Sequence, residues 1–305
     1  MSAEAIQARI LEADLLAGAE KNRLLSILGE LWKKKVVFVG GVILFSLLFV
    51  GIFAPYVSPY DPLKQELNIR ISPPIWMAGA KAGHILGTDA LGRDILSRLI
   101  WGARISLTVA VGATALSIGI GASLGLLAGF SGRKVDDLIM RLVDIQLAFP
   151  FILLAIALVS VMGASLQNVV IVLGITTWAT PCRLVRAEVL SIKEREYIVA
   201  ARASGQRTWS ILLGQILPNA ATPILVLATF DLGRFILSEA SLSYLGLGVP
   251  PPTPSWGSMV ADGQDYLSTA WWVSTIPGFI IMFACLGGNL LGDFLRDVMD
   301  PELKE

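Results

Sequence analysis

Residues 196–218, EYIVAARASGQRTWSILLGQILP, form a polar and basic stretch between two apolar segments of membrane-spanning length. Its composition favours helix, and Gly205 stands where one short helix would end. A second helical run is expected from Thr208 to Leu217, with its end at Pro218. Six of the chain's 24 basic residues lie between Arg183 and Arg207. A structured, basic element between two spans predicts a surface for a partner on the cytoplasmic side of a membrane. An ordinary cytoplasmic connector is the alternative that these residues leave open.

The composition of the whole chain predicts that lipid is the solvent for much of it. Of its 305 residues, 54% are hydrophobic and 16% are charged, with a mean hydropathy of +0.69, whereas soluble domains are about 25% charged. At ~1.5 Å per residue, six apolar stretches can each cross a ~30 Å hydrocarbon core as a helix. These stretches are Val36–Val57, Ile105–Phe130, Leu138–Met162, Asn168–Leu190, Ala220–Leu247 and Trp271–Leu295. We therefore expect an all-α polytopic membrane protein with about six transmembrane helices.

The distribution of basic residues predicts the orientation. With the N-terminus inside, the inner segments hold sixteen basic residues and the outer segments five, which favours both termini in the cytoplasm. The expected order is a cytoplasmic amphipathic segment, a first transmembrane helix, an outer loop with an amphipathic helix, a five-helix core and a cytoplasmic tail. Their ranges are 1–35, 36–57, 58–104, 105–295 and 296–305, and the core includes the loop 191–218.

The loop resembles a motif of a known family. The pattern Ala-Ala-x3-Gly, followed thirteen residues later by proline, is similar to the Glu-Ala-Ala coupling loop of ABC importer permeases. The matching positions are Ala200, Ala201, Gly205, Leu217 and Pro218, and Glu196 and Arg202 lie within the same element. Two positions depart from the family pattern: Val199 stands where the motif has its glutamate, and Gln215 where an isoleucine is usual. The valine puts in doubt a salt bridge that the glutamate would supply, but not the turn.

Four further stretches resemble the dipeptide/oligopeptide/nickel subfamily of these permeases, in particular its second permease subunit. They are HILGTDALGRDILSRLIWGARIS at 84–106, MRLVD at 140–144 with Pro150, EASLSYLGLG at 239–248 with Trp256 and Gly257, and NLLGDFLRDVMDP at 289–301. The resemblance implies a type I ABC importer permease fold and a transmembrane path for di- or oligopeptides or a similar small solute. It leaves the substrate open among dipeptides, oligopeptides, nickel, glutathione and other small solutes.

The resemblance also implies the rest of the assembly. A second, homologous permease would complete the path, two cytoplasmic ATPase subunits would dock at the coupling loop, and an extracytoplasmic binding protein would deliver substrate. The location implied is the bacterial inner membrane. The chain has no Gly-x4-Gly-Lys-Ser/Thr loop, so ATP and Mg²⁺ would be used by the partner subunits, and this chain would bind no cofactor and catalyse nothing.

Charged residues inside a span are the candidates for lining the path. Asp231 and Arg234 are three residues apart in the fifth span and share a helix face, with Glu239 further along. Such groups normally face a bundle interior or a wet path. A packing salt bridge is the alternative for the Asp231–Arg234 pair.

Other classes of function find less support in the residues. The single histidine, His84, lies in the outer loop, so a serine dyad at Gly121-Ala-Ser-Leu-Gly125 would lack a base. The small-residue spacing of Gly119, Gly121, Gly125 and Gly129 predicts close helix packing instead. There is no metal-ligand cluster and no basic tract for nucleic acid. An ATP-independent channel or secondary transporter remains the alternative to an importer subunit.

Overall fold

The computed structural model describes residues 35–299, and every regular element in that range is helical, which confirms the all-α class. The longer helices are α2 (Lys35–Ile52), α4 (Ile95–Phe130), α5 (Arg133–Ala148), α6 (Phe151–Met162), α7 (Leu166–Thr177), α8 (Ala179–Ile192), α11 (Leu217–Tyr244) and α13 (Trp272–Met299). The shorter elements are α3 (Ala54–Val57), η1 (Leu67–Ile69), α9 (Glu196–Ala203), α10 (Thr208–Ile211), the π-turn η2 (Leu212–Ile216), α12 (Trp256–Asp262) and η3 (Gln264–Tyr266). The predicted N-terminal amphipathic segment and the end of the C-terminal tail lie outside the described residues.

Three helical runs are long and apolar enough to cross a membrane: α4, Thr208–Tyr244 and α13. Two bent pairs, α5 with α6 and α7 with α8, raise this number to five, and Phe38–Ile52 is a shorter apolar helix. All six predicted stretches are thus mainly helical, and six crossings stay a prediction. One boundary differs: α4 begins at Ile95, not Ile105. The helix continues through this more polar run because Asp94 caps it, accepting a 2.7 Å hydrogen bond from the Ser97 amide.

Prolines explain both bent pairs. α5 and α6 meet at 89°, and α7 and α8 at 43°. Phe149 precedes Pro150 and adopts an extended conformation, as the proline ring requires of the residue before it. Pro181 has no N–H to donate to the carbonyl of Thr177, so the helical ladder is interrupted where α7 gives way to α8.

Glycines in α4 let α8 pack closely, as their spacing predicts. A Cβ atom added at Gly121, Gly125 or Gly129 would lie 2.6 Å from an atom of α8 or of Trp178 just before it. Gly119 faces open space and takes no part. Lipid tails are as apolar as the side chains, so burying apolar side chains contributes little to helix association in a membrane. Small residues favour association there because they let the backbones pack closely.

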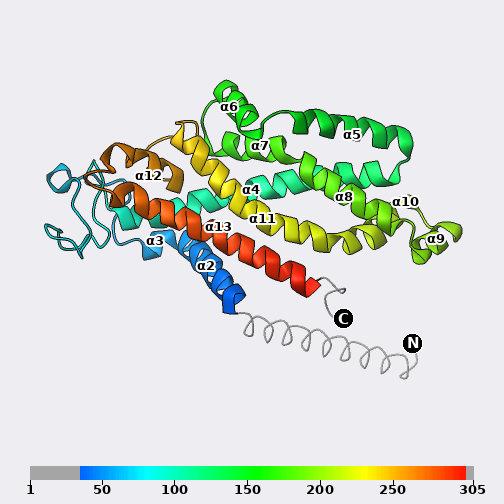
Figure 1. Ribbon diagram of the computed structural model, residues 1–305, viewed down its shortest axis with the longest axis horizontal. Coiled ribbons are helices and arrows are strands. Elements are labelled where there is room, and N and C mark those ends of the chain that lie inside the picture. The colour runs from blue at the N-terminus through cyan, green and yellow to red at the C-terminus, as the bar shows by residue number, and fades with distance from the viewer. Residues whose placement is uncertain (1–34, 300–305) are drawn as a thin grey trace, which may run out of the picture.

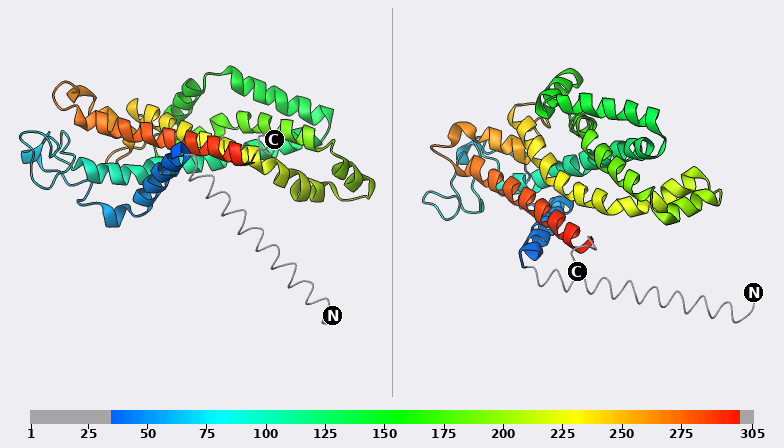
Figure 2. Two further views of the ribbon diagram at one scale, coloured as in Figure 1. Left: turned by 60° about the horizontal axis from the view of Figure 1, so that its bottom comes forward. Right: turned by 45° about the vertical axis from the view of Figure 1, so that its right-hand side comes forward.

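Figure 1 shows an elongated bundle in which α4, α11 and α13 run lengthwise. α9 and α10 lie at one end of the bundle, and α12 with the loop 58–94 lies at the other. α5 and α6 follow one long edge, and α2 packs against α13 near the opposite edge. The two ends remain far apart in both rotated views of Figure 2. A signal that passes between them must therefore travel along the lengthwise helices.

Candidate functional site

The turn after α9 is a helix stop that depends on Gly205. The Gln206 amide donates to the Ala201 carbonyl at 3.1 Å, and the Gly205 amide to the Arg202 carbonyl at 3.0 Å. This pair of bonds is the Schellman arrangement, which needs its glycine position in the left-handed region. Gly205 has φ +75°, and an added Cβ would meet nothing within 4 Å. The backbone conformation, and not local crowding, therefore requires glycine here.

A small apolar cluster seats α9 and α10 on the rest of the bundle. Ile198, Ile211, Leu212 and Ile216 are each at most 3% exposed. They pack with one another and with residues of α8 and of the start of α11, namely Val185, Val189, Ile192 and Ala220. Full burial of such a side chain is worth about 1.5–3 kcal/mol. The loop is consequently a firmly held element rather than a loose connector.

The outward side of the same segment also carries large apolar side chains. Val199, Trp209 and Leu213 are each more than half exposed, and Tyr197 is 41% exposed. Glu196, Ala200, Arg202 and Gly205 are also exposed, and Ala201 is half-buried. Exposed apolar side chains on a rigid protrusion are a feature of protein interaction sites.

Several of the nearby basic residues have partners inside the chain. Arg186 forms a two-point ion pair with Asp136 of α5, with Nη2 2.6 Å from Oδ2. Arg183 donates to Asp144 at 2.6 Å, and the Arg202 guanidinium lies 4.6 Å from the centre of the Phe130 ring. These contacts tie α8 and α9 to α5 and to the end of α4. The positive charge that the sequence presents to a partner is thus partly used in holding this region together.

The expected end of the second short helix at Pro218 is wrong. The chain stays helical from Thr208 to Tyr244, because the π-turn η2 directly precedes the proline. The Leu217 amide donates to the Leu212 carbonyl, five residues back, and Pro218 then falls in the first turn of α11, where no N–H is needed. Leu217 is half-buried and Pro218 exposed. The loop is therefore continuous with a long lengthwise helix.

The three charged residues of the fifth span do not share one environment. Asp231 is buried, and its Oδ1 lies 3.7 Å from Nη1 of Arg234. Arg234 is exposed, and its guanidinium lies 5.5 Å from the Phe151 ring centre. Glu239 is 0% exposed and accepts hydrogen bonds from Ser106 at 3.0 Å and Ser243 at 2.6 Å. Within this chain the carboxyl group of Glu239 ties α11 to α4, and its place along the path stays a prediction.

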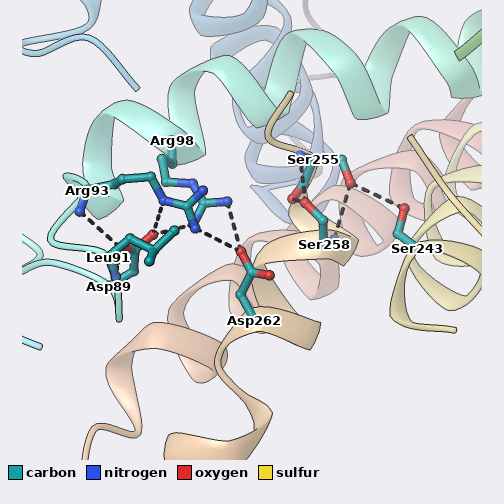
Figure 3. A network of polar contacts seen from close by, with 8 residues as sticks. All are labelled: Asp89, Leu91, Arg93, Arg98, Ser243, Ser255, Ser258 and Asp262. Carbon is teal, nitrogen blue, oxygen red and sulfur yellow. Dashed lines mark hydrogen bonds and ion pairs between the residues drawn. The ribbon is translucent and has the colours of Figure 1, made fainter. Parts of the chain in front are cut away.

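A polar network joins the loop before α4 to α12, and the sequence alone does not reveal it. Asp89 accepts from Nε of Arg93 at 2.7 Å and from Nη1 of Arg98. Both arginines also donate to Asp262 of α12, at 3.2 and 3.0 Å (Figure 3). The alternation of Asp and Arg in 89–98 was the available signal, but their shared partner lies more than 160 residues away.

Comparison with known proteins gives two family matches. Residues 121–305 match the binding-protein-dependent transport system inner membrane component. Residues 26–74 match the N-terminal transmembrane domain of oligopeptide transport permease C.

Curated relatives cover most of the chain. The di/tripeptide transport system permease protein DppC of Pseudomonas aeruginosa (strain UCBPP-PA14) is 46% identical, over 92% of this chain and 93% of that protein. The dipeptide permease protein DppC of Escherichia coli (strain K12) is 42% identical, over 91% and 94%. A solved chain of the MetNI methionine ABC transporter, inward facing, has a TM-score of 0.55 at 21% identity, covering 67% of this chain and 97% of that chain. That last likeness concerns the fold alone.

Proposed function

This chain belongs to the binding-protein-dependent transport system inner membrane components, and we propose that it is the permease subunit of an ATP-driven importer of di- or oligopeptides. The peptide substrate is supported by relatives at 42–46% identity that carry dipeptide or di/tripeptide permease names. Membership of the family makes the chain an integral membrane permease component. As a non-catalytic subunit, it would leave ATP hydrolysis, with Mg²⁺, to partner ATPases.

The observation that carries the proposal is the form of the α9–α10 element. An exposed outer side that carries large apolar side chains is fixed on a buried cluster by Ile198, Ile211 and Ile216. We assign this outer side to docking of a cytoplasmic ATPase subunit. Glu196, Ala200, Ala201 and Arg202 would form or border the contact, and Gly205 would set the turn. Small side chains at Ala200 and Ala201 allow a partner's groove to approach the backbone.

The continuity of the helix supplies a route for coupling. A displacement of α9 pushes on Ile211 and Ile216, which belong to the same helical run as α11. Leu217 and Pro218 lie where the π-turn gives way to α11. A movement of α9 and α10 relative to α11 would therefore bend the helix at that point. α11 carries Asp231 and Arg234 toward the middle of the bundle. ATPase closure would in this way tilt the helices around the path and alternate its access.

The assembly follows from the same proposal. A second, homologous permease would complete the path, two ATPases would dock beneath, and an extracytoplasmic binding protein would deliver the peptide. In a bacterial inner membrane with both termini cytoplasmic, α9 and α10 would lie inside and α12 outside. Their separation at opposite ends of the bundle supports this arrangement.

Reconstitution in vesicles tests the proposal. The chain with its second permease, both ATPases and the binding protein is expected to take up a labelled dipeptide or tripeptide only with ATP and Mg²⁺. Vesicles without the ATPases should show no uptake. Transport by this chain alone under an ion gradient, without ATP, would instead make it a channel or secondary transporter and contradict the proposal.

A further inference from the structure

A pocket of about 230 Å³ lies where the two proline breaks meet. One wall comes from the junction of α5 and α6, another from the junction of α7 and α8, and Arg234 of α11 completes it. Its lining includes Gln146, Phe149, Phe151, Thr177, Thr180 and Arg234. The Gln146 amide nitrogen donates to the Thr176 carbonyl at 3.0 Å, which holds the two junctions together. The pocket is therefore built by four helix ends and one side chain from a fifth helix.

Arg234 brings a positive charge to this pocket, and its ion-pair partner among the described residues, Asp231, lies 3.7 Å away. This distance is too long for a hydrogen bond, and the Arg234 side chain is 43% exposed. Among the described residues, no acceptor forms a hydrogen bond with its guanidinium. The face of Phe151 fixes the group by a cation–π contact while leaving its N–H groups available. Arginine in this state is suited to a carboxylate, which it can hold through two parallel bonds.

The broken helices supply the complementary acceptors. Because residue 181 is proline, the Thr177 carbonyl has no helical donor four residues on. α5 ends at Ala148 beside the pocket, and the last carbonyls of a helix carry partial negative charge. A ligand with a carboxylate at one side and N–H groups beside it matches these features. The end of a peptide has both.

We propose that this pocket is a transit subsite for the terminal carboxylate of the transported peptide, with Arg234 as its partner. The inference rests on the proposed peptide transport and specifies where the peptide's charge is met. Pockets that enclose a drug-sized ligand measure roughly 300–1,000 Å³, so this one takes only the end of a peptide. A carboxylate needs a partner inside a membrane. Partial exposure of Arg234 keeps the contact weak enough for the peptide to move on.

Uptake by the complete transporter tests the subsite. A tripeptide and its C-terminal amide are compared in vesicles for the unchanged chain, Arg234→Gln and the matched control Arg104→Gln. Arg104 is also exposed and stacks on an aromatic ring, Trp101, but it lies in α4 away from the pocket. The ratio of acid to amide uptake should fall roughly tenfold in Arg234→Gln and stay unchanged in Arg104→Gln. Any preference of the binding protein is common to all three and cancels. An unchanged ratio in Arg234→Gln overturns the subsite.

The double variant Asp231→Asn/Arg234→Gln separates recognition from folding. It removes the buried carboxylate charge that Arg234→Gln alone leaves without its partner. The lowered ratio should persist in the double variant and recover partly in Arg234→Lys. Recovery of the ratio in the double variant would attribute the effect to Asp231 and contradict the proposal.

A binding measurement does not depend on transport of the amide. A cysteine at position 180 (Thr180→Cys) in the assembled transporter should be protected from a thiol reagent by millimolar free tripeptide. Protection should be weaker with the amide and absent when Arg234→Gln is added. Equal protection by acid and amide overturns the subsite but leaves peptide transport intact. Absence of peptide uptake by the unchanged transporter would instead remove the proposed function itself.

Discussion

The two ends of the bundle are stabilised by different interactions. At the α12 end, buried ions and a buried tryptophan join segments distant in sequence: Arg98 is 4% and Asp89 2% exposed, and Trp256 donates to the Leu99 carbonyl at 3.0 Å. At the α9–α10 end, an apolar cluster seats the element while its outer side stays open. One end is completed by the chain's own contacts, and the other presents apolar side chains that the described part of the chain leaves exposed. The proposed coupling to an ATPase would use this difference, with one end held by internal contacts and the other open to a partner.

The largest effect is expected from breaking the ion network. Asp89→Ala removes the acceptor of Arg98 and Arg93 and leaves the Arg98 charge buried with only the half-exposed Asp262. Breaking a buried pair in this way costs about 3–5 kcal/mol. We expect a lower thermal unfolding temperature of the purified chain in detergent and less protein in the membrane. Asp262→Asn is the control, because its carboxylate is 43% exposed and its loss should cost less than ~1 kcal/mol.

If Asp89→Ala and Asp262→Asn lower the unfolding temperature equally, the α12 end is not held by the buried ions. The contrast with the other end would then rest on the packing of Trp256 alone.

The next effect concerns Gly205. A valine there would have to adopt φ +75°, at a cost of roughly 1–2 kcal/mol, and the turn would rearrange to avoid it. We expect Gly205→Val to insert normally and keep the thermal stability of the α12 end, yet to lose most ATP-dependent uptake and co-purification with the ATPases. Gly205→Asn is the matched control, since asparagine tolerates the left-handed region. Uptake by Gly205→Val at the level of Gly205→Asn would count against a role for the turn in docking.

A smaller change tests the tryptophan at the fixed end. Trp256→Phe keeps an aromatic ring in a site that is 0% exposed but loses the hydrogen bond to Leu99, leaving that carbonyl without this donor. The expected loss is about 1 kcal/mol from the hydrogen bond, with a further cost for the smaller ring. Thermal unfolding measures it. A Trp209→Phe change is the control at the open end, where the ring is 64% exposed and stability should not respond.

The sequence was a good guide to local features and a poor one to partners far along the chain. Apolar length predicted the helices, and the spacing of Gly121, Gly125 and Gly129 predicted close packing, because both depend on neighbouring residues. A charge within a span predicts contact with a wet path, which makes Glu239 a candidate for its lining. The donors to Glu239, Ser106 and Ser243, one of them on a different helix, could not be seen from spacing. Pro218 failed as a stop because a π-turn absorbs it.

The pocket around Arg234 also depends on contacts between segments that are distant in sequence. Each proline break could be anticipated from Pro150 or Pro181 alone. Their meeting depends on how α5 packs beside α8, which Arg186 and Asp136 help to fix across 50 positions. The sequence shows each proline break by itself, but it does not show that the two breaks lie side by side in the folded protein.

The smallest expected effect sharpens the comparison at the open end. Val199 occupies the position where the resembling motif has a glutamate, and its side chain is 53% exposed. Because the Val199 side chain is more than half exposed, Val199→Glu should change stability by less than ~0.5 kcal/mol. A restored salt bridge to an ATPase would be solvent-exposed and worth at most about 1 kcal/mol, so uptake should change less than about fivefold. Comparing the uptake of Val199→Glu with that of Gly205→Val shows whether docking depends on the shape of the turn or on its charge. A loss of uptake as large as that of Gly205→Val would show that an apolar residue at 199 is itself part of the contact.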